Sequence, residues 1–360
     1  MKKLVVMGLA MAITVSMMNG VCAQPVHAAK GKGLKVALLM SGAANDQGWN
    51  QTAYEGAQKA CDKYGCELAY TENLEAADIS AAFADYASAG YDVVIGHGYE
   101  FGDPALEVAE TYPATKFICT ESDASSDNVA SYVMACEQTA YVEGIIAASM
   151  TKSDKLGAIG PIQGDSLVKI VNGYEDGAKS VNPDIEVQTA WTNSFVDTQL
   201  AQEAAKAMIE NGVDVIKHCA NACGNGAIAA AVDADIWCQG DSYDQSSLAP
   251  ENILDSAIYN LDVVIDKAIE SVVDDNFEGD VYNPGMADGA VEVLLSDNLT
   301  DDVKATAQAE RTGCLPGRWN GSSLQTSDGR QKCKPDQWRD CDDDTFKRSG
   351  IGADRHSRTA

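Results

Sequence analysis

The feature that most constrains the fold is a repeated alternation of short apolar runs with helical segments. The first unit joins the run 34–40 to a helical stretch at 50–63, in which small and apolar residues recur on one face. The units that follow predict strands at 67–70, 91–95, 116–119 and 129–133, with helices at 79–89 and 104–111. Strands that alternate with helices imply a parallel sheet with right-handed crossovers.

A second series of the same kind follows a long helical pattern at 138–151. It predicts strands at 155–159, 186–191, 214–218 and 235–239, with helices at 166–180, 198–211 and 226–233. A chain of 360 residues is also longer than one hydrophobic core usually serves.

The two series predict an α/β fold with two hinged lobes, each a parallel sheet flanked by helices. The first lobe is expected to comprise 34–137 and 256–290, and the second 138–255 and 291–310. Ligands of open parallel sheets sit beyond the carboxyl ends of the strands. A cleft between two such edges is therefore the expected binding site.

The N-terminal 28 residues have the pattern of a signal peptide. Lys2 and Lys3 precede an apolar run at 4–18 that is too short to span a bilayer comfortably, and small-x-small cleavage sites end at Ala23 and Ala28. Cys22 is an alternative lipidation site, but its flanks lack the usual Leu and the neighbouring small residue. We expect an exported, soluble, periplasmic protein, with a lipid anchor at Cys22 as the less favoured alternative.

The composition changes abruptly after Glu310. Residues 311–360 contain few aliphatic side chains and are slightly basic, whereas the preceding body is strongly acidic. The segment is either a natural disordered tail or the product of a reading-frame shift near Glu310. The absence of any hydrophobic periodicity favours the frame shift.

The formal charge of −28 disfavours partners that carry phosphate backbones or anionic lipid. His218, Cys219, Cys223 and Cys238 are suitable residue types for zinc, but their spacing matches no strong metal motif. We therefore expect no nucleic acid, no metal and no cofactor.

Eleven cysteines in an exported chain suggest disulfides. Cys61 and Cys66 straddle a predicted helix end, with Gly65 as its stop signal, and could close a small loop. Cys119 and Cys136 each lie beside an apolar run, as neighbouring strands would allow.

The loop after the first strand contains Asn45, Asp46, Trp49 and Asn50 directly before a helix. An aromatic face beside a carboxylate and amides suits a planar heterocycle, because the ring stacks while hydrogen bonds read its polar edge. The competing interpretation is that Asp46 or Asn50 caps the helix and Trp49 packs in the core. The residues alone do not decide between them.

Other predicted strand ends carry similar side chains. Tyr99 follows the third strand, Glu121 the fourth, Phe195 the strand that ends at 191, and Gly224 with Asn225 the strand that ends at 218. Each of these residues alone is common in loops. Because all of them follow the carboxyl ends of strands, together they predict a cleft.

Enzyme signatures are absent from the sequence. It contains no Gly-x-Gly-x-x-Gly at the first helix, no Walker phosphate loop and no Gly-x-Ser-x-Gly elbow. We therefore expect a binding protein and not an enzyme.

The segment 45–51, with Ala53-Tyr-Glu-Gly56, resembles the basic membrane protein family of ABC-importer substrate-binding proteins, which includes purine nucleoside receptors of spirochaetes. The supporting segments lie in the same order along the chain, at 102–105, 172–177, 191–195, 223–226 and 244–250. The resemblance covers about 34–304.

The resemblance implies a type I periplasmic-binding fold whose lobes close on a small heterocyclic ligand, a purine base or nucleoside. It implies an aromatic sandwich at Trp49 and Phe195 and a base-reading carboxylate at Glu121. The implied partner is the permease of an ABC importer in the inner membrane, and we expect a monomer.

Departures from the family pattern bear on the ligand. Met40 replaces an acidic residue at the end of the first strand, and Tyr259 replaces a lysine that reads the ribose. The ribose-reading aspartate aligns with Ser242 or, with a one-residue slip, with Asp241. We therefore expect a nucleobase or related heterocycle rather than a full nucleoside. The alternative functions are a ligand-presenting sensor for a membrane receptor and, less favoured, a nucleoside hydrolase.

Overall fold

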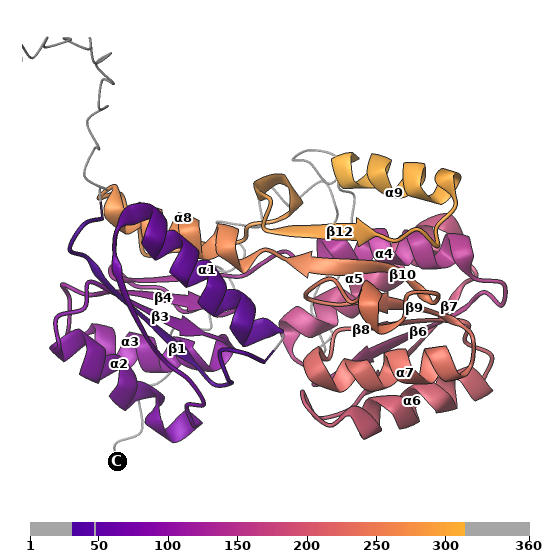
Figure 1. Cartoon of the computed structure of the whole chain (residues 1–360), viewed down its shortest axis with the longest axis horizontal. Helices are drawn as coiled ribbons and strands as arrows, with labels where there is room; N and C mark the ends of the chain where they lie inside the picture. The colour runs from indigo at the N-terminus through magenta and orange to yellow at the C-terminus, as the bar shows by residue number, and fades with distance from the viewer. Residues whose placement is uncertain (1–30, 47, 314–360) are drawn as a thin grey trace, which may run out of the picture.

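The computed structural model describes residues 31–46 and 48–313, which form two lobes lying side by side (Figure 1). The predicted signal peptide with Cys22 lies outside the described residues. The same is true of the tail predicted at 311–360, except for 311–313, which are helical, so the boundary predicted at 311 is wrong by three residues. The first lobe contains a parallel sheet of six strands in the order β11-β5-β4-β3-β1-β2. Its strands are β1 (Lys35–Met40), β2 (Glu67–Thr71), β3 (Val93–His97), β4 (Lys116–Thr120), β5 (Val129–Tyr132) and β11 (Val281–Tyr282).

The second lobe repeats this arrangement, with the order β12-β10-β9-β8-β6-β7. Its strands are β6 (Lys155–Gly160), β7 (Glu186–Trp191), β8 (Val215–His218), β9 (Trp237–Gly240), β10 (Ile253–Tyr259) and β12 (Val291–Leu295). The prediction of a wholly parallel sheet is wrong at one edge, because β12 pairs antiparallel with β10. The chain has returned from the first lobe at this point and runs against β10.

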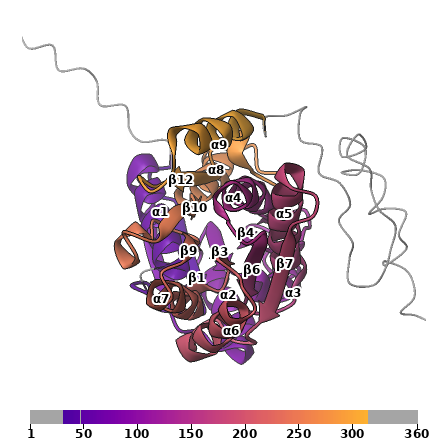
Figure 2. The same cartoon turned by 90° about the vertical axis from the view of Figure 1, so that its right-hand side faces the viewer.

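Helices cover both faces of each sheet (Figures 1 and 2). In the first lobe, α1 (Trp49–Tyr64) and α8 (Leu261–Val273) lie on one face, and α2 (Ile79–Ser88) and α3 (Gly102–Ala109) on the other. In the second lobe, α4 (Glu137–Met150) and α5 (Asp165–Val181) lie opposite α6 (Thr198–Glu210) and α7 (Asn225–Asp233), while α9 (Asp301–Gly313) lies over α4. Both sheets are therefore buried between helix layers, as their nearly unbroken apolar strands require.

Strand β1 shows how this pattern arises. Val36, Leu38 and Met40 pack in the cluster formed with α1 and α8, whereas Ala37 and Leu39 pack with α2 and α3. Successive side chains of a strand point to opposite faces, so every position must be apolar when both faces are covered.

The described chain passes between the lobes three times, between β5 and α4, between β10 and α8, and between β11 and β12. The lobe boundary expected at 256 falls within β10, which continues in the second sheet to Tyr259. Within the described ranges, no helix has both the length and the apolar character needed to cross a membrane.

Candidate ligand-binding cleft

The carboxyl ends of the two sheets meet at the junction of the lobes. Gly48 lies in the loop after β1, and Asn221 follows β8. A Cβ atom added to Gly48 would lie only 3.0 Å from Asn221 Oδ1. The loops that carry most of the predicted site residues therefore approach one another from opposite lobes.

Asp46 holds the start of α1. Its two carboxylate oxygens accept hydrogen bonds from the backbone N–H groups of Gly48, Asn50 and Gln51 at 2.9, 3.1 and 3.0 Å, and from Asn50 Nδ2 at 2.8 Å. A carboxylate at this end of a helix satisfies free amides and complements the helix dipole. The capping interpretation thus describes Asp46, but not Asn50, which is buried within α1 and accepts a hydrogen bond from Gly42 N, whereas Asn45 is exposed.

Trp49 is half-buried, and its ring stacks on His97 with centroids 4.5 Å apart and planes inclined by 24°. His97 Nε2 lies 3.2 Å from the backbone oxygen of Trp49, and its Nδ1 lies 2.9 Å from Thr120 Oγ1. Burial lowers the pKa of His97 to about 4, so the imidazole is neutral. It donates from Nε2 and accepts at Nδ1, which fixes the indole beside the end of β4.

Glu121 directly follows β4 and Thr120. Its Oε1 accepts the N–H of Met134 at 3.0 Å, and burial raises its pKa to about 7. Among the described residues, most non-glycine residues with a positive φ are Asn or Asp. The two that are neither are Glu121, with a φ of 56°, and Ser242, with a φ of 68°. Asn and Asp tolerate this region, whereas other residues there are strained, and such strain clusters at functional sites.

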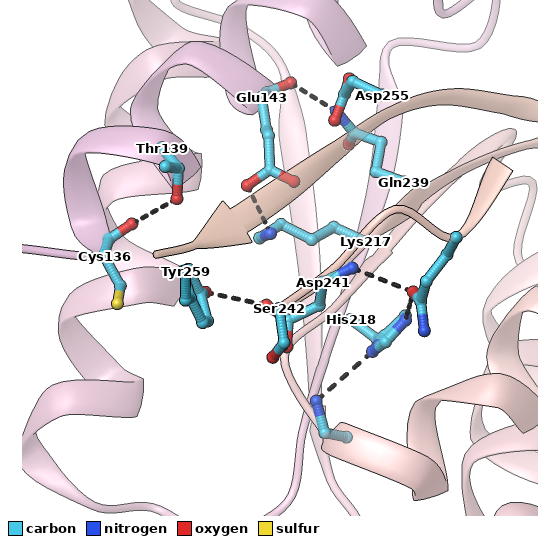
Figure 3. Close-up of polar contacts among 12 residues, drawn as sticks. Cys136, Thr139, Glu143, Lys217, His218, Gln239, Asp241, Ser242, Asp255 and Tyr259 are labelled. Carbon is cyan, nitrogen blue, oxygen red and sulfur yellow. Dashed lines mark hydrogen bonds and ion pairs between the residues drawn. The ribbon is translucent and has the colours of Figure 1, made fainter. Parts of the chain in front are cut away.

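The buried Asp241 and Tyr259 form a group with the half-buried Ser242 in the second lobe (Figure 3). Tyr259 OH donates to Asp241 Oδ1 at 2.8 Å, and Ser242 Oγ donates to Asp241 Oδ2 at 2.8 Å. Each oxygen of the candidate ribose-reading carboxylate thus already accepts a hydrogen bond from the protein.

Gln245 was not predicted from the sequence as a site residue, yet it joins several that were. Its Oε1 accepts from the backbone N–H of Asp241 and lies 2.9 Å from His218 Nε2, and its Nε2 donates to Asn225 Oδ1 at 3.2 Å. The only signal in the sequence was its place in segment 244–250, because two of its partners, His218 and Asn225, lie 27 and 20 residues away along the chain.

The remaining predicted residues lie at the same strand ends but have fewer polar contacts with other predicted site residues. Gly224 packs against the ring of His218, where an added Cβ would lie 1.9 Å from Nδ1. The side chain of Phe195 is 40% exposed and that of Tyr99 is 64% exposed, so each presents an aromatic ring to solvent. Where the rings would lie around a ligand stays a prediction.

A cavity of about 490 Å³ also lies between the lobes, on the hinge side. Helix α1 lines it through Thr52 and Gly56, and the second lobe contributes Ser242, Tyr243 and Tyr259. Trp49, Glu121 and Phe195 do not line this cavity. The cavity reaches Ser242 and Tyr259, the two residues that donate to Asp241, from the hinge side. It is separate from the strand ends that carry the aromatic rings.

The cysteines near His218 do not form a cluster. Cys219, Cys223 and Cys238 belong to three different hydrophobic clusters. The thiols of Cys223 and Cys238 donate to backbone oxygens of Asp197 and Asn252. In the described ranges, no group of three potential ligands could hold a metal ion.

Cys119 and Cys136 also lie apart, in different hydrophobic clusters, so the structure does not bring them together as neighbours. The thiol of Cys119 donates to the backbone oxygen of Phe101 at 3.7 Å.

Comparisons with known proteins agree with this architecture. A purine-binding protein of Brucella abortus is 30% identical over 80% of this chain and 82% of its own length. The nucleoside-binding protein BmpA of Lactococcus lactis is 29% identical over 88% of this chain and 98% of its own. The structure of an ABC transporter solute-binding protein from Aeropyrum pernix superposes with a TM-score of 0.71 at 22% identity, covering 82% of this chain and 95% of the other.

The predicted two-lobed type I periplasmic-binding fold is thereby confirmed. Residues 34–316 match the family model described as ABC transporter substrate-binding protein, PnrA-like. Its members are substrate-binding proteins of transporters and not enzymes, as the sequence predicted. The chain belongs to the Bmp family of PnrA-like ABC transporter substrate-binding proteins.

Proposed function

We propose that this protein binds a purine-type nucleobase in the cleft between its lobes and delivers it, as a monomer, to the permease of an ABC importer. The observation that carries the proposal is the chain of contacts Trp49–His97–Thr120, which ends at the residue before Glu121. It places a fixed aromatic ring and a carboxyl at one edge of the first sheet. A flat ring with N–H donors suits that pair, because the face stacks and the edge is read by the carboxylate.

The state of Asp241 favours a base over a nucleoside. A ribose hydroxyl would have to compete for Asp241 with the hydrogen bonds from Tyr259 and Ser242, each 2.8 Å long. Tyr259 is buried, so a ligand that displaced its hydroxyl would leave that hydroxyl without a partner. The relatives named for purine and nucleoside binding support the purine class, and Asp241 supports the choice within it.

Titration calorimetry with adenosine, guanosine, hypoxanthine, xanthine and urate tests this proposal. We expect the free bases to bind more tightly than the nucleosides. In Tyr259→Phe, Asp241 Oδ1 becomes available, and the preference for bases should shrink by about tenfold, the typical value of one hydrogen bond to a charged group.

Tyr243→Phe is the matched control, because it removes a hydroxyl from the adjoining cavity wall and should leave the preference unchanged. Tight nucleoside binding without any response to free bases would contradict the choice of a base. If none of the five compounds binds, the purine class itself is wrong.

A further inference from the structure

Helix α1 ends with two cysteines that lie at its far end from Trp49. Gly65 has a φ of 76° and closes the helix in the left-handed conformation. The N–H groups of Gly65 and Cys66 both donate to the backbone oxygen of Cys61, at 2.8 and 2.9 Å. The bond from Cys66 spans six residues and belongs to a Schellman-type helix end, in which the first and last residues characteristically touch.

In this helix end the two touching residues are both cysteines. Each thiol is close enough to affect the pKa of the other, and Cys66 packs against the hydrophobic cluster that contains Cys61. Cys61 is buried and Cys66 is half-buried, and both are free thiols in the structure. The backbone hydrogen bond brings Cys66 back beside Cys61, and proximity of this kind is the first condition for a disulfide.

Other thiols in the described ranges have different partners. Cys119, Cys223 and Cys238 donate to the backbone oxygens of Phe101, Asp197 and Asn252. Cys61 and Cys66 thus differ from these cysteines in facing another thiol. Burial also raises the pKa of Cys61 to about 12, so this thiol is a poor nucleophile and its oxidation needs a catalyst.

We propose that Cys61 and Cys66 are joined by an intramolecular disulfide in the exported protein. Both S–H bonds break and one S–S bond forms. The two electrons and two protons pass to the disulfide of a thiol oxidoreductase, which is reduced to two thiols. Substrate-binding proteins of ABC importers work outside the cytoplasm, where such oxidants act.

The bond would lock the last turn of α1. This helix packs closely on α8, where an added Cβ on Gly56 would lie 2.8 Å from the Cα of Asp262. α8 directly follows the crossing from β10. A fixed helix end would therefore stabilise the packing of α1 on α8 within the first lobe.

Peptide mapping of the full chain, exported and purified without reductant, tests the proposal. The protein is denatured, alkylated and digested, and the masses of the peptides are measured by mass spectrometry. We expect a species that contains both Cys61 and Cys66, carries no alkyl group on either and lacks two hydrogens. Alkylation of both cysteines without reductant, or linkage of either to another cysteine, would overturn the proposal.

A thermal measurement separates the bond from other effects of substitution. Reductant should lower the Tm of the wild-type protein by about 2–6 °C. It should leave the Tm of Cys66→Ser unchanged, because that variant has no Cys61–Cys66 bond to lose. An equal response of the two proteins to reductant would contradict the assignment.

Discussion

Two features of Glu121 destabilise the folded protein, and a residue without a function would not be expected to have both. Its backbone lies in the left-handed region, and its carboxyl is held where burial raises the pKa to about 7. A raised pKa means that folding favours the protonated form, so the unliganded protein loses this contribution to stability as the pH rises through 7. A ligand that donates an N–H to the carboxylate would offset that loss.

This reasoning predicts pH-dependent binding. Between pH 8 and pH 6 the carboxylate becomes mostly protonated, and it loses the negative charge that strengthens a hydrogen bond from a base N–H. Calorimetry with hypoxanthine should therefore show affinity falling by about tenfold over this range. Glu121→Gln should bind about ten- to a hundredfold more weakly at pH 8 and lose the pH dependence.

Glu100→Gln is the matched control, because it removes a carboxylate from the loop after β3 and should keep the wild-type profile. A Glu121→Gln variant that retains the full dependence would show that another group titrates.

At the residue scale, the sequence predicted which strand ends would carry polar and aromatic side chains, but not what those side chains bind. The partner of Tyr259 is 18 residues away, and the oxygen that His97 Nε2 contacts belongs to Trp49, 48 residues away. Neither contact leaves a local pattern. The two interpretations of Asp46 could be separated only by seeing three backbone amides converge on its carboxylate.

Helix α4 is joined to the second sheet by a buried ion pair (Figure 3). Lys217 Nζ lies 2.5 Å from Glu143 Oε2, and the two side chains are 2% and 0% exposed. Asp255 on β10 is also fully buried beside them. Burial raises the pKa of both Glu143 and Asp255, well above the ordinary value for Asp255. Burial alone would lower the pKa of Lys217, but attraction to Glu143 and Asp241 outweighs it and raises that pKa.

One ammonium group therefore lies near two buried carboxyls, and burial favours the protonated form of Asp255. Glu143 Oε1 and Asp255 Oδ1 each lack a hydrogen-bond partner among the described residues. The contact between α4 and β8 thus depends on Lys217, the cation that pairs with Glu143.

Lys217→Met should lower the free energy of unfolding by about 3–5 kcal/mol, because Glu143 is left as an unpaired buried charge. The control is Lys59→Met. Lys59 pairs with Asp262 at 2.6 Å, but its side chain is 75% exposed. Its loss should have little effect on stability, because water screens an exposed ion pair. Urea unfolding at pH 7 measures both, and equal effects would contradict the account of the buried pair.

At the element scale, the regular strand–helix units were predictable because each carries its own hydrophobic period. The last third of the fold was harder to predict from the sequence. Strand β11 has only two residues, and β12 pairs with β10 after an excursion of the chain into the other lobe. The antiparallel edge follows from that return path, which leaves no periodic signal.

At the scale of the whole molecule, three crossings join two lobes whose strand ends face one another. Trp49 and Glu121 lie in the first lobe, and Phe195 and Asp241 lie in the second. A ligand that contacts both groups would hold the lobes together, so closure by hinge rotation is the expected response to binding.

A competition experiment tests the central claim most directly. The protein is incubated with an equimolar mixture of purine bases, nucleosides and monosaccharides, washed and denatured, and the released compounds are identified by mass spectrometry. The account predicts that a free purine base is retained in preference to all others. Preferential retention of a sugar or an intact nucleoside, or retention of nothing, would contradict it.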